Sequence, residues 1–244
     1  MKILIRGAGD LATGIAAELW ERGHQILMTD VAIPLAVRRE VAFSRAVYEE
    51  HAVVEGMEAV LAESFEEAEA IMATRKIAVK VDEKAEVRKE YLQDVLVDGI
   101  MAKKNLGTRI SDAPLVIGIG PGFTAGEDVD VVIETKRGHN LGRVIRSGSA
   151  VPNTGIPGII GGYGKERVMH AQAEGILRNA ASIGDIVEAR AVIAEIETEN
   201  GTVPVEASLS GLLRGLIRDG YPVTNGFKIA DIDPRKEELQ NCFT

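Results

Sequence analysis

The feature that most constrains this chain is an ungapped internal repeat near its C-terminus. The segment beginning at Gly175 aligns with the segment beginning at Gly211, and every matched position is offset by 36 residues. The matched pairs are spread along both copies: Arg178 with Arg214, Gly184 with Gly220, Val187 with Val223, and Glu195-Ile196-Glu197 with Asp231-Ile232-Asp233. A period this short often indicates a solenoid, but two copies cannot stack into one. The pattern favours two small all-β halves that pair into one barrel or sandwich.

Two paired halves of this kind resemble the barrel-sandwich hybrid of biotinyl and lipoyl domains. Those carrier domains present a modifiable lysine on the hairpin between their halves. The corresponding stretch here, residues 197–204 (ETENGTVP), contains no lysine. We therefore expect residues 165–244 to form a barrel-sandwich hybrid with a structural role and no covalent biotin or lipoate.

The N-terminal part shows the pattern of a strand, a glycine turn, a helix and a second strand. Residues 2–6 and 25–30 predict buried strands, and apolar residues recur on one face of a helix over residues 10–22. A right-handed crossover makes such strands parallel. Further predicted elements are helices within 33–50, 64–75 and 84–92, and strands within 76–82, 94–100 and 114–120. Residues 1–120 are therefore expected to form a Rossmann-like, doubly wound parallel α/β domain.

Glycines then become too frequent for regular helix, over residues 121–164. A hairpin is expected inside this segment, with residues 129–135 and 141–148 as its arms and KRGHN between them. Residues 149–164 fit either a mobile lid over a ligand or a linker, and the sequence does not distinguish the two.

The turn after the first strand matches a dinucleotide-binding fingerprint, Gly7-x-Gly9-x-x-Ala12. Gly7 permits a tight turn, Gly9 lets the backbone approach a pyrophosphate, and Ala12 keeps the helix close to the strand. The helix N-terminus offers N–H groups and partial positive charge to a phosphate. Asp30 ends the second strand, where a carboxylate binds a ribose hydroxyl and favours NAD over NADP. The alternative is a glycine turn that serves packing only.

Two residues at the same helix start complete the predicted cofactor site, Asp10 and Thr13. As an N-cap, Asp10 would compete with a phosphate for the helix end. A second glycine turn, with Gly120 and Gly122, follows a strand of the same sheet and is expected to face the same crevice. A type II turn explains these glycines equally well.

Two residues are candidates for catalysis. Asp98 ends an apolar strand, where a buried carboxylate needs either a salt-bridge partner, such as a nearby lysine, or a catalytic purpose. His139 lies among Lys136, Arg137 and Arg143 in the hairpin connection, and its imidazole is suited to acid or base chemistry near an anion. A solvated hairpin tip is the alternative for this connection. Arg137 is included in the predicted cofactor site.

Composition excludes several classes of function. Lys and Arg number 28 against 37 Asp and Glu, a formal net charge of −9, which disfavours a nucleic-acid partner. Cys242 is the only cysteine, so an internal disulfide is impossible, and the histidine spacing predicts no metal site. Apolar runs are too short for a membrane span or a signal peptide, so a cytoplasmic protein without a membrane partner is expected. A homo-oligomer is compatible with these properties.

Several motifs together, RGAGDLATG, VLVDGIMAKKNLGT, IGIGPGFTAGEDVDVVIETKRGHNLGRVI, SAVPNTGIPG and GFKIADIDPR, resemble the YqeB family of the selenium-dependent molybdenum hydroxylase system. The N-terminal part is also similar to XdhC-like xanthine dehydrogenase accessory factors. This resemblance implies an accessory factor that binds NAD or a molybdopterin dinucleotide and assists molybdenum-cofactor maturation or insertion. The alternatives are an NAD-dependent oxidoreductase and a non-enzymatic protein whose repeat docks onto a molybdenum hydroxylase. Whether a reaction is catalysed stays open at this point.

Overall fold

The computed structural model describes residues 1–155 and 157–244, and the chain divides into two compact units. The first unit comprises Met1–Pro34 and Ala42–Thr154, and the second comprises Leu35–Val41 and Gly155–Thr244. The short segment Leu35–Val41 thus belongs to the second unit, although its neighbours in sequence belong to the first.

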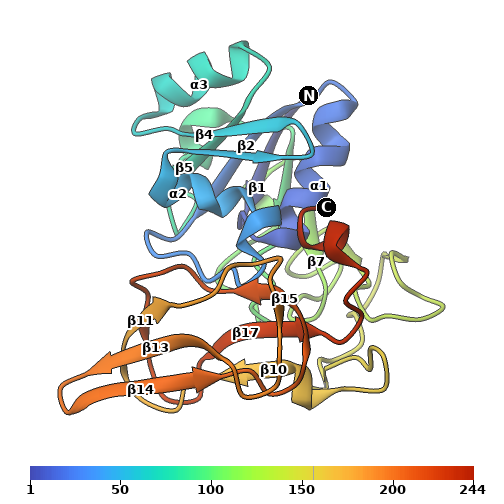
Figure 1. The fold of residues 1–244 in the computed structure, drawn as a ribbon. Coiled ribbons are helices and arrows are strands. Elements are labelled where there is room, and N and C mark those ends of the chain that lie inside the picture. Colours follow the sequence, from blue (N-terminus) through green and yellow to red (C-terminus); the bar gives the residue numbers. More distant parts are fainter. Residues whose placement is uncertain (156) are drawn as a thin grey trace. The chain divides into compact units, whose positions relative to one another are not determined.

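A nine-stranded mixed sheet forms the first unit, in the order β3-β4-β5-β2-β1-β6-β7-β8-β9 (Figure 1). The strands are β1 (Lys2–Arg6), β2 (Gln25–Asp30), β3 (His51–Val54), β4 (Met57–Leu61), β5 (Ile77–Val81), β6 (Val95–Asp98), β7 (Leu115–Ile119), β8 (Val131–Ile133) and β9 (Val144–Ile145). Neighbouring strands from β4 to β8 pair in parallel, whereas β3 and β9 pair antiparallel at the two edges.

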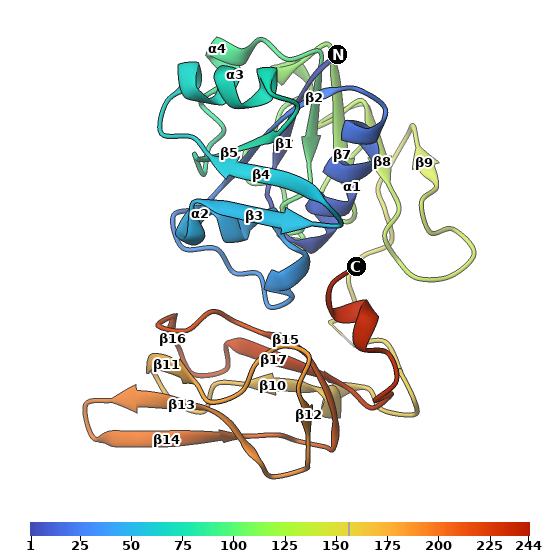
Figure 2. The same cartoon turned by 45° about the horizontal axis from the view of Figure 1, so that its top comes forward.

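Helices are few in this unit. They are α1 (Asp10–Glu21), α2 (Ala46–Glu49), α3 (Phe65–Ala73) and α4 (Arg88–Tyr91), with 3-10 turns η1 (Arg39–Val41, in the segment assigned to the second unit), η2 (Phe43–Arg45) and η3 (Ile110–Asp112). α3 and α4 lie together (Figure 2), and their Met72 and Tyr91 pack with Leu4, Leu96 and Val116 of the strands into one buried cluster. This packing buries the apolar residues on one face of the sheet.

The predicted doubly wound parallel fold is wrong for this unit. Doubly wound sheets carry helices in their crossovers, but here β6 connects to β7 through a loop with only η3, and β7 connects to β8 through turns. Positive φ angles at Met101, Lys103 and Gly107 show why the first of these connections cannot continue as a helix. Antiparallel hairpins at both edges further separate the sheet from the Rossmann arrangement.

The helix predicted within residues 33–50 forms only as the short α2 after two 3-10 turns, because tertiary contacts override the local pattern in its first part. The carbonyl of Val37 accepts a hydrogen bond from the Leu216 N–H at 2.9 Å, and Arg39 donates to the Leu216 carbonyl at 3.2 Å. Local capping does hold at α3, where Ser64 accepts from the Glu67 N–H at 3.1 Å. The predicted strands 2–6 and 25–30 are confirmed as β1 and β2.

Two four-stranded antiparallel sheets form the second unit, in the orders β10-β17-β15-β12 and β14-β13-β11-β16. Their strands are β10 (Val168–His170), β11 (Gly175–Asn179), β12 (Ile186–Val187), β13 (Val192–Thr198), β14 (Gly201–Glu206), β15 (Gly211–Leu216), β16 (Pro222–Val223) and β17 (Lys228–Asp233); two 3-10 turns are η4 (Lys165–Arg167) and η5 (Leu239–Cys242). Two open sheets thus take the place of the predicted barrel-sandwich hybrid. Leu177, Ile193, Leu213 and Ile229 lie in their common core.

The strands of the two repeat copies correspond at the same 36-residue offset, β11 with β15, β12 with β16 and β13 with β17. The copies exchange their short strands: β12 pairs with β15, and β16 pairs with β11. A side chain at Gly175 would overlap the Glu197 carbonyl, and one at Gly211 would overlap the Asp233 carbonyl. The glycine that begins each copy is therefore required by a close approach of backbone to backbone.

Candidate functional site

Most of the predicted site residues lie at one edge of the first unit's sheet. Because β1, β6, β7 and β8 pair in parallel, the loops that follow them leave the sheet at the same, carboxyl edge. Ligands of open α/β sheets bind at this edge. These loops contain residues 7–9, 99–108, 120–128 and 134–143.

The first glycine of the N-terminal turn has a packing role. Gly7 has φ +93°, and a Cβ on it would lie 3.1 Å from backbone atoms of Ile100. Its N–H donates to the Thr29 carbonyl at 2.7 Å. A side chain at Gly7 would therefore push the turn away from the loop that follows β6.

Asp30 fastens the same turn to β2. Its Oδ2 accepts from the Ala8 N–H at 2.8 Å, and its Oδ1 accepts from the Val31 N–H at 2.7 Å. Burial raises the pKa of Asp30, and these two hydrogen bonds only partly oppose that rise. The carboxylate already has two backbone partners, and its predicted contact with a ribose stays a prediction.

The start of α1 carries no side-chain cap. Gly9 occupies the N-cap position with φ −69°, and a Cβ placed on it would have no atom within 4 Å. Asp10 is the first helical residue, and its Oδ1 accepts from the adjacent Leu11 N–H at 2.9 Å. The predicted capping by Asp10 is therefore wrong. Space is open around the position that a Gly9 side chain would take.

Ala12 and Thr13 lie buried behind that helix start. A Cβ on Gly99 would come within 3.2 Å of the Ala12 Cβ, so the helix and the β6 loop touch here. The Thr13 hydroxyl accepts from the Phe43 N–H at 2.9 Å and donates to the Ala8 carbonyl at 3.2 Å. Both side chains therefore pack beneath the turn and have a structural role.

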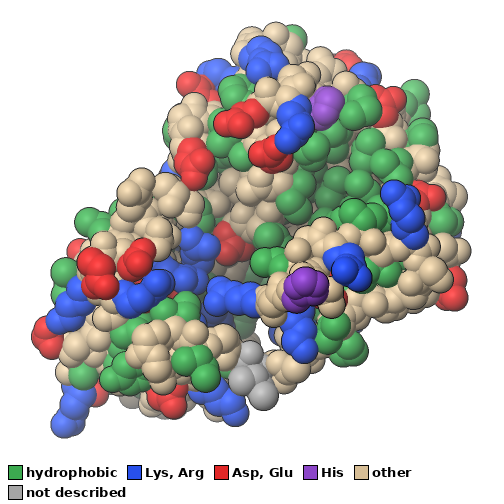
Figure 3. Space-filling view, turned by 90° about the vertical axis from the view of Figure 1, so that its right-hand side faces the viewer, with side chains coloured by type: hydrophobic (Ala, Val, Ile, Leu, Met, Phe, Trp, Pro, Cys, Tyr) green, Lys and Arg blue, Asp and Glu red, His purple; other side chains and the backbone are tan. Residues whose placement is uncertain are grey.

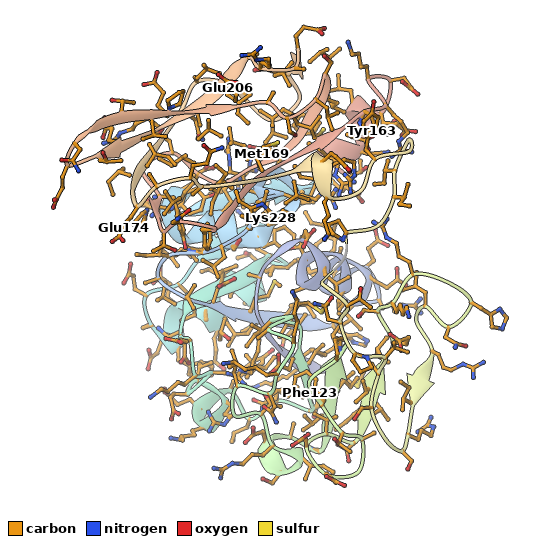
Figure 4. The ribbon with its side chains drawn as sticks, turned by 90° about the horizontal axis from the view of Figure 1, so that it is seen from below. Phe123, Tyr163, Met169, Glu174, Glu206 and Lys228 are labelled. Atoms are coloured by element: carbon orange, nitrogen blue, oxygen red, sulfur yellow. The ribbon has the colours of Figure 1, made fainter. Side chains whose placement is uncertain are left out.

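The second glycine turn packs against its neighbours in the same way. Gly120 has φ +77°, and its Cβ would lie 2.7 Å from the Thr135 hydroxyl; Gly122 has φ +117°, and its Cβ would lie 2.6 Å from the Lys104 nitrogen. The segment 99–104 therefore lies between the two glycine turns, where the sequence predicted an open crevice. Phe123, labelled in Figure 4, follows this turn and belongs to the buried cluster beneath α3 and α4.

A buried polar group joins the ends of β1 and β6. Arg6 donates to Asp98 at 3.2 Å and also to Thr108, whose hydroxyl donates to the same Asp98 oxygen at 2.5 Å. The three side chains are only 2–4% exposed. Asp98 thus has an arginine partner where the sequence suggested a lysine. The geometry gives Asp98 a structural function, and its catalytic role stays a prediction.

Arg137 and His139 lie in the connection from β8 to β9 and are exposed to solvent. Within the described residues, no hydrogen bond or ion pair joins them to the Gly7 turn. At the base of this connection, buried Glu134 accepts from the N–H groups of Lys136 at 2.7 Å and Val151 at 2.9 Å. Burial raises the pKa of Glu134, but hydrogen bonds from Val151, Lys136 and Thr135 outweigh it and leave the pKa below its ordinary value.

Sequence reasoning missed Thr108 and Glu134. Thr108 lies in a loop and gives no periodic signal. Glu134 directly follows the apolar run of β8, as Asp98 lies at the end of β6, and this similarity was the available signal. Within the described ranges, no helix is long and apolar enough to cross a membrane, and no three His, Cys, Asp or Glu side chains cluster in a way that suits a metal ion.

Comparison with known proteins gives one similar sequence. The uncharacterized protein YqeB of Escherichia coli (strain K12) is 47% identical over 235 residues, which cover 96% of this chain. The chain spans 43% of the length of that relative. No protein-family model matches the chain.

Solved structures match only distantly. An aspartoacylase family protein from Mesorhizobium loti is 12% identical, over 95% of this chain and 84% of that chain, with a TM-score of 0.32. A succinylglutamate desuccinylase/aspartoacylase from Rhodobacter sphaeroides is also 12% identical, over 95% and 85% of the two chains, with the same TM-score. Similarity at this level transfers neither an activity nor a substrate.

These comparisons correct the function predicted from the resemblance. The similar sequence is uncharacterized, so it supplies no molybdenum-related or XdhC-like activity for this chain. The prediction of NAD binding rested on a Rossmann fold, and the mixed sheet does not form one. An XdhC-like factor in molybdenum-cofactor maturation, an NAD-dependent oxidoreductase and a docking protein for a molybdenum hydroxylase are therefore wrong as predictions for this chain.

Proposed function

We propose that the first unit binds a small phosphate-bearing molecule at the start of α1. The observation that carries this proposal is the glycine at the N-cap of a 12-residue helix, which supplies no side-chain cap and has open space beside it, although the Asp10 carboxylate accepts from the Leu11 N–H of the first turn. The first N–H groups of a helix lack intrahelical partners, and the helix dipole gives them partial positive charge. An anion placed there is hydrogen-bonded and stabilised electrostatically.

Support also comes from the contrast between the two glycines of this turn. Gly7 is explained by its contact with Ile100 and its positive φ. Gly9 has an ordinary φ and no neighbour within 4 Å, so the protein itself does not require a glycine there. A ligand that approaches the backbone closely does require one, because a side chain would occupy the same space.

The Gly9→Asp variant tests the proposal. Asp is a favourable N-cap residue, so this variant should fold at least as stably as the unmodified chain while its carboxylate occupies the anion position. Gly14→Asp is the matched control, because Gly14 lies on the same helix and also has open space around it. With inorganic pyrophosphate as the probe in calorimetric titration, we expect about tenfold or greater weakening for Gly9→Asp.

The control should bind pyrophosphate as the unmodified chain does. Equal affinity in the unmodified chain and Gly9→Asp would overturn the proposal, as would failure of the unmodified chain to bind pyrophosphate. Melting temperatures of all three proteins establish that a loss of binding does not come from unfolding.

A further inference from the structure

The connection between β8 and β9 carries an unusual concentration of positive charge. Within residues 135–148, here called the basic loop, the cationic side chains and one histidine are all exposed: Lys136, Arg137, His139, Arg143 and Arg146. The loop projects to the right in Figure 1. Figure 3 looks onto that side of the molecule and shows Lys and Arg side chains with a histidine among them.

Few of these charges have a counterpart nearby. In the part of the chain that the structure describes, these five side chains form no hydrogen bond or close ion pair, whereas Arg22, Arg88 and Arg178 pair with carboxylates. Lys136 has a charge interaction with Glu134 at the base of the loop. No Asp or Glu occurs between Glu134 and Glu166, although the whole chain carries a net charge of −9. Positive charge is therefore concentrated on the loop, with the Glu134 carboxylate at its base.

Backbone hydrogen bonds hold the loop in shape, while its cationic side chains are exposed. Glu134 fixes its base by accepting from the backbone N–H groups of Lys136 and Val151. Further hydrogen bonds cross the loop, from the Gly142 N–H to the Glu134 carbonyl at 2.8 Å and from the Leu141 N–H to the Gly138 carbonyl at 3.1 Å. A pinned backbone lowers the entropy that binding must overcome, so the loop is organised for recognition.

Two exposed apolar side chains on the loop favour a partner that carries apolar groups as well as negative charge. Leu141 is 58% exposed and Val144 is 49% exposed. The loop contains no Phe, Tyr or Trp, the large aromatic side chains of single-strand stacking platforms. Exposed aliphatic groups beside cations match a protein segment in which acidic and apolar residues alternate.

We propose that the basic loop is a docking surface for an acidic protein segment that also carries aliphatic side chains. Carboxylates of the partner meet the arginines, which present planar donors suited to them. Leu141 and Val144 contribute apolar contact beside the charge pairs. Because the arginines are exposed, the association weakens with salt, and its rate depends on the charge of the loop.

A short fluorescent peptide of repeated Glu-Glu-Leu is the probe, followed by anisotropy with the full chain. We expect binding that weakens as salt rises, and about tenfold lower affinity for Arg143→Glu. Lys84→Glu is the matched control, because Lys84 is an exposed cation of the same unit outside the loop. It should change the affinity less than twofold, by the weak effect of a distant exposed charge.

Absence of peptide binding, or equal loss in both variants, would overturn the proposal. Tighter binding of a single-stranded oligonucleotide than of the peptide would overturn it in favour of a nucleic-acid partner. Pyrophosphate titration of Arg143→Glu separates this inference from the proposed function. The start of α1 should bind pyrophosphate unchanged when the loop is altered.

Discussion

The two copies of the 36-residue repeat share a pattern of charged residues but place it in different surroundings. In the first copy, Arg178 and Glu197 form an ion pair at 2.9 Å with side chains 48% and 53% exposed. In the second copy, Arg214 pairs with Asp231 at 3.2 Å, and these side chains are 17% and 5% exposed. The two arginines are equivalent, but they pair with different acidic partners, since Asp231 matches Glu195 and Glu197 matches Asp233. The shared charge pattern thus produces a solvent-screened pair in one sheet and a buried network in the other.

The difference arises from what covers the second copy. Val37, from the segment that returns to this unit, would contact a Cβ on Gly215 at 2.9 Å, and its carbonyl bonds Leu216. Buried Arg167 also reaches Asp231 at 3.0 Å. The position equivalent to Gly215 in the first copy is Asn179, which has a side chain. Burial of the second copy therefore depends on segments outside the repeat.

Removing the central carboxylate of the buried network should have the largest effect. Asp231→Ala leaves Arg167 and Arg214 without their partner, and breaking a buried ion pair costs about 3–5 kcal/mol. The equivalent Glu195→Ala changes an exposed residue and should cost less than about 0.5 kcal/mol. Urea unfolding followed by circular dichroism measures both. Similar losses for the two variants would contradict the comparison.

Substitution of the glycine that begins each repeat copy should destabilise the protein equally in both copies, unlike substitution of the acidic residues. In Gly175→Ala and Gly211→Ala the new methyl group meets a carbonyl oxygen of the neighbouring strand, and each should lose about 1–3 kcal/mol of unfolding free energy. Gly164→Ala is the control, since the nearest atom to its Cβ would be 3.8 Å away. A loss confined to one copy would show that the close approach is not shared.

A smaller effect is expected from acid. Burial raises the pKa of Asp233, but its hydrogen bonds and charge interactions with Arg235 outweigh this and hold the pKa below its ordinary value. A lowered pKa contributes stability that is present above the unfolded-state pKa and lost as the pH falls through the folded-state value. The unfolding midpoint should therefore drop in acid, and Asp233→Asn should reduce that drop. An unchanged pH profile in the variant would contradict this assignment.

The sequence predicted those elements whose formation depends on hydrophobic pattern or helix capping within the element itself. Alternation and apolar runs located β1, β2 and the antiparallel β8 and β9, and the Ser64 cap located α3. The non-helical course of Leu35–Arg38 could not be predicted this way, because the Val37 carbonyl accepts a hydrogen bond from a residue far along the chain. The absence of helices after β6 was missed for a related reason: the Rossmann assignment rested on the first βαβ unit.

The candidate site divides in the same manner. Gly7, Gly9 and Gly120 were found because glycine turns after strands have a local signature. The filling of the space between the two turns by residues 99–104 was not predictable, because it depends on how three loops pack. The Arg6–Asp98–Thr108 group likewise joins residues about a hundred positions apart. The local sequence indicates that a glycine turn follows the strand. It does not indicate which residues fill the space beside each glycine.

The exchange of β12 and β16 between the repeat copies has a consequence for how such a unit can be assembled. Each copy supplies a strand that completes the other copy's sheet, so a polypeptide containing one copy would leave an edge of its sheet unpaired. Two such half-length molecules would complete each other only as a two-fold symmetric pair. Because both copies belong to one chain, their strands pair within the molecule, and this pairing does not depend on protein concentration.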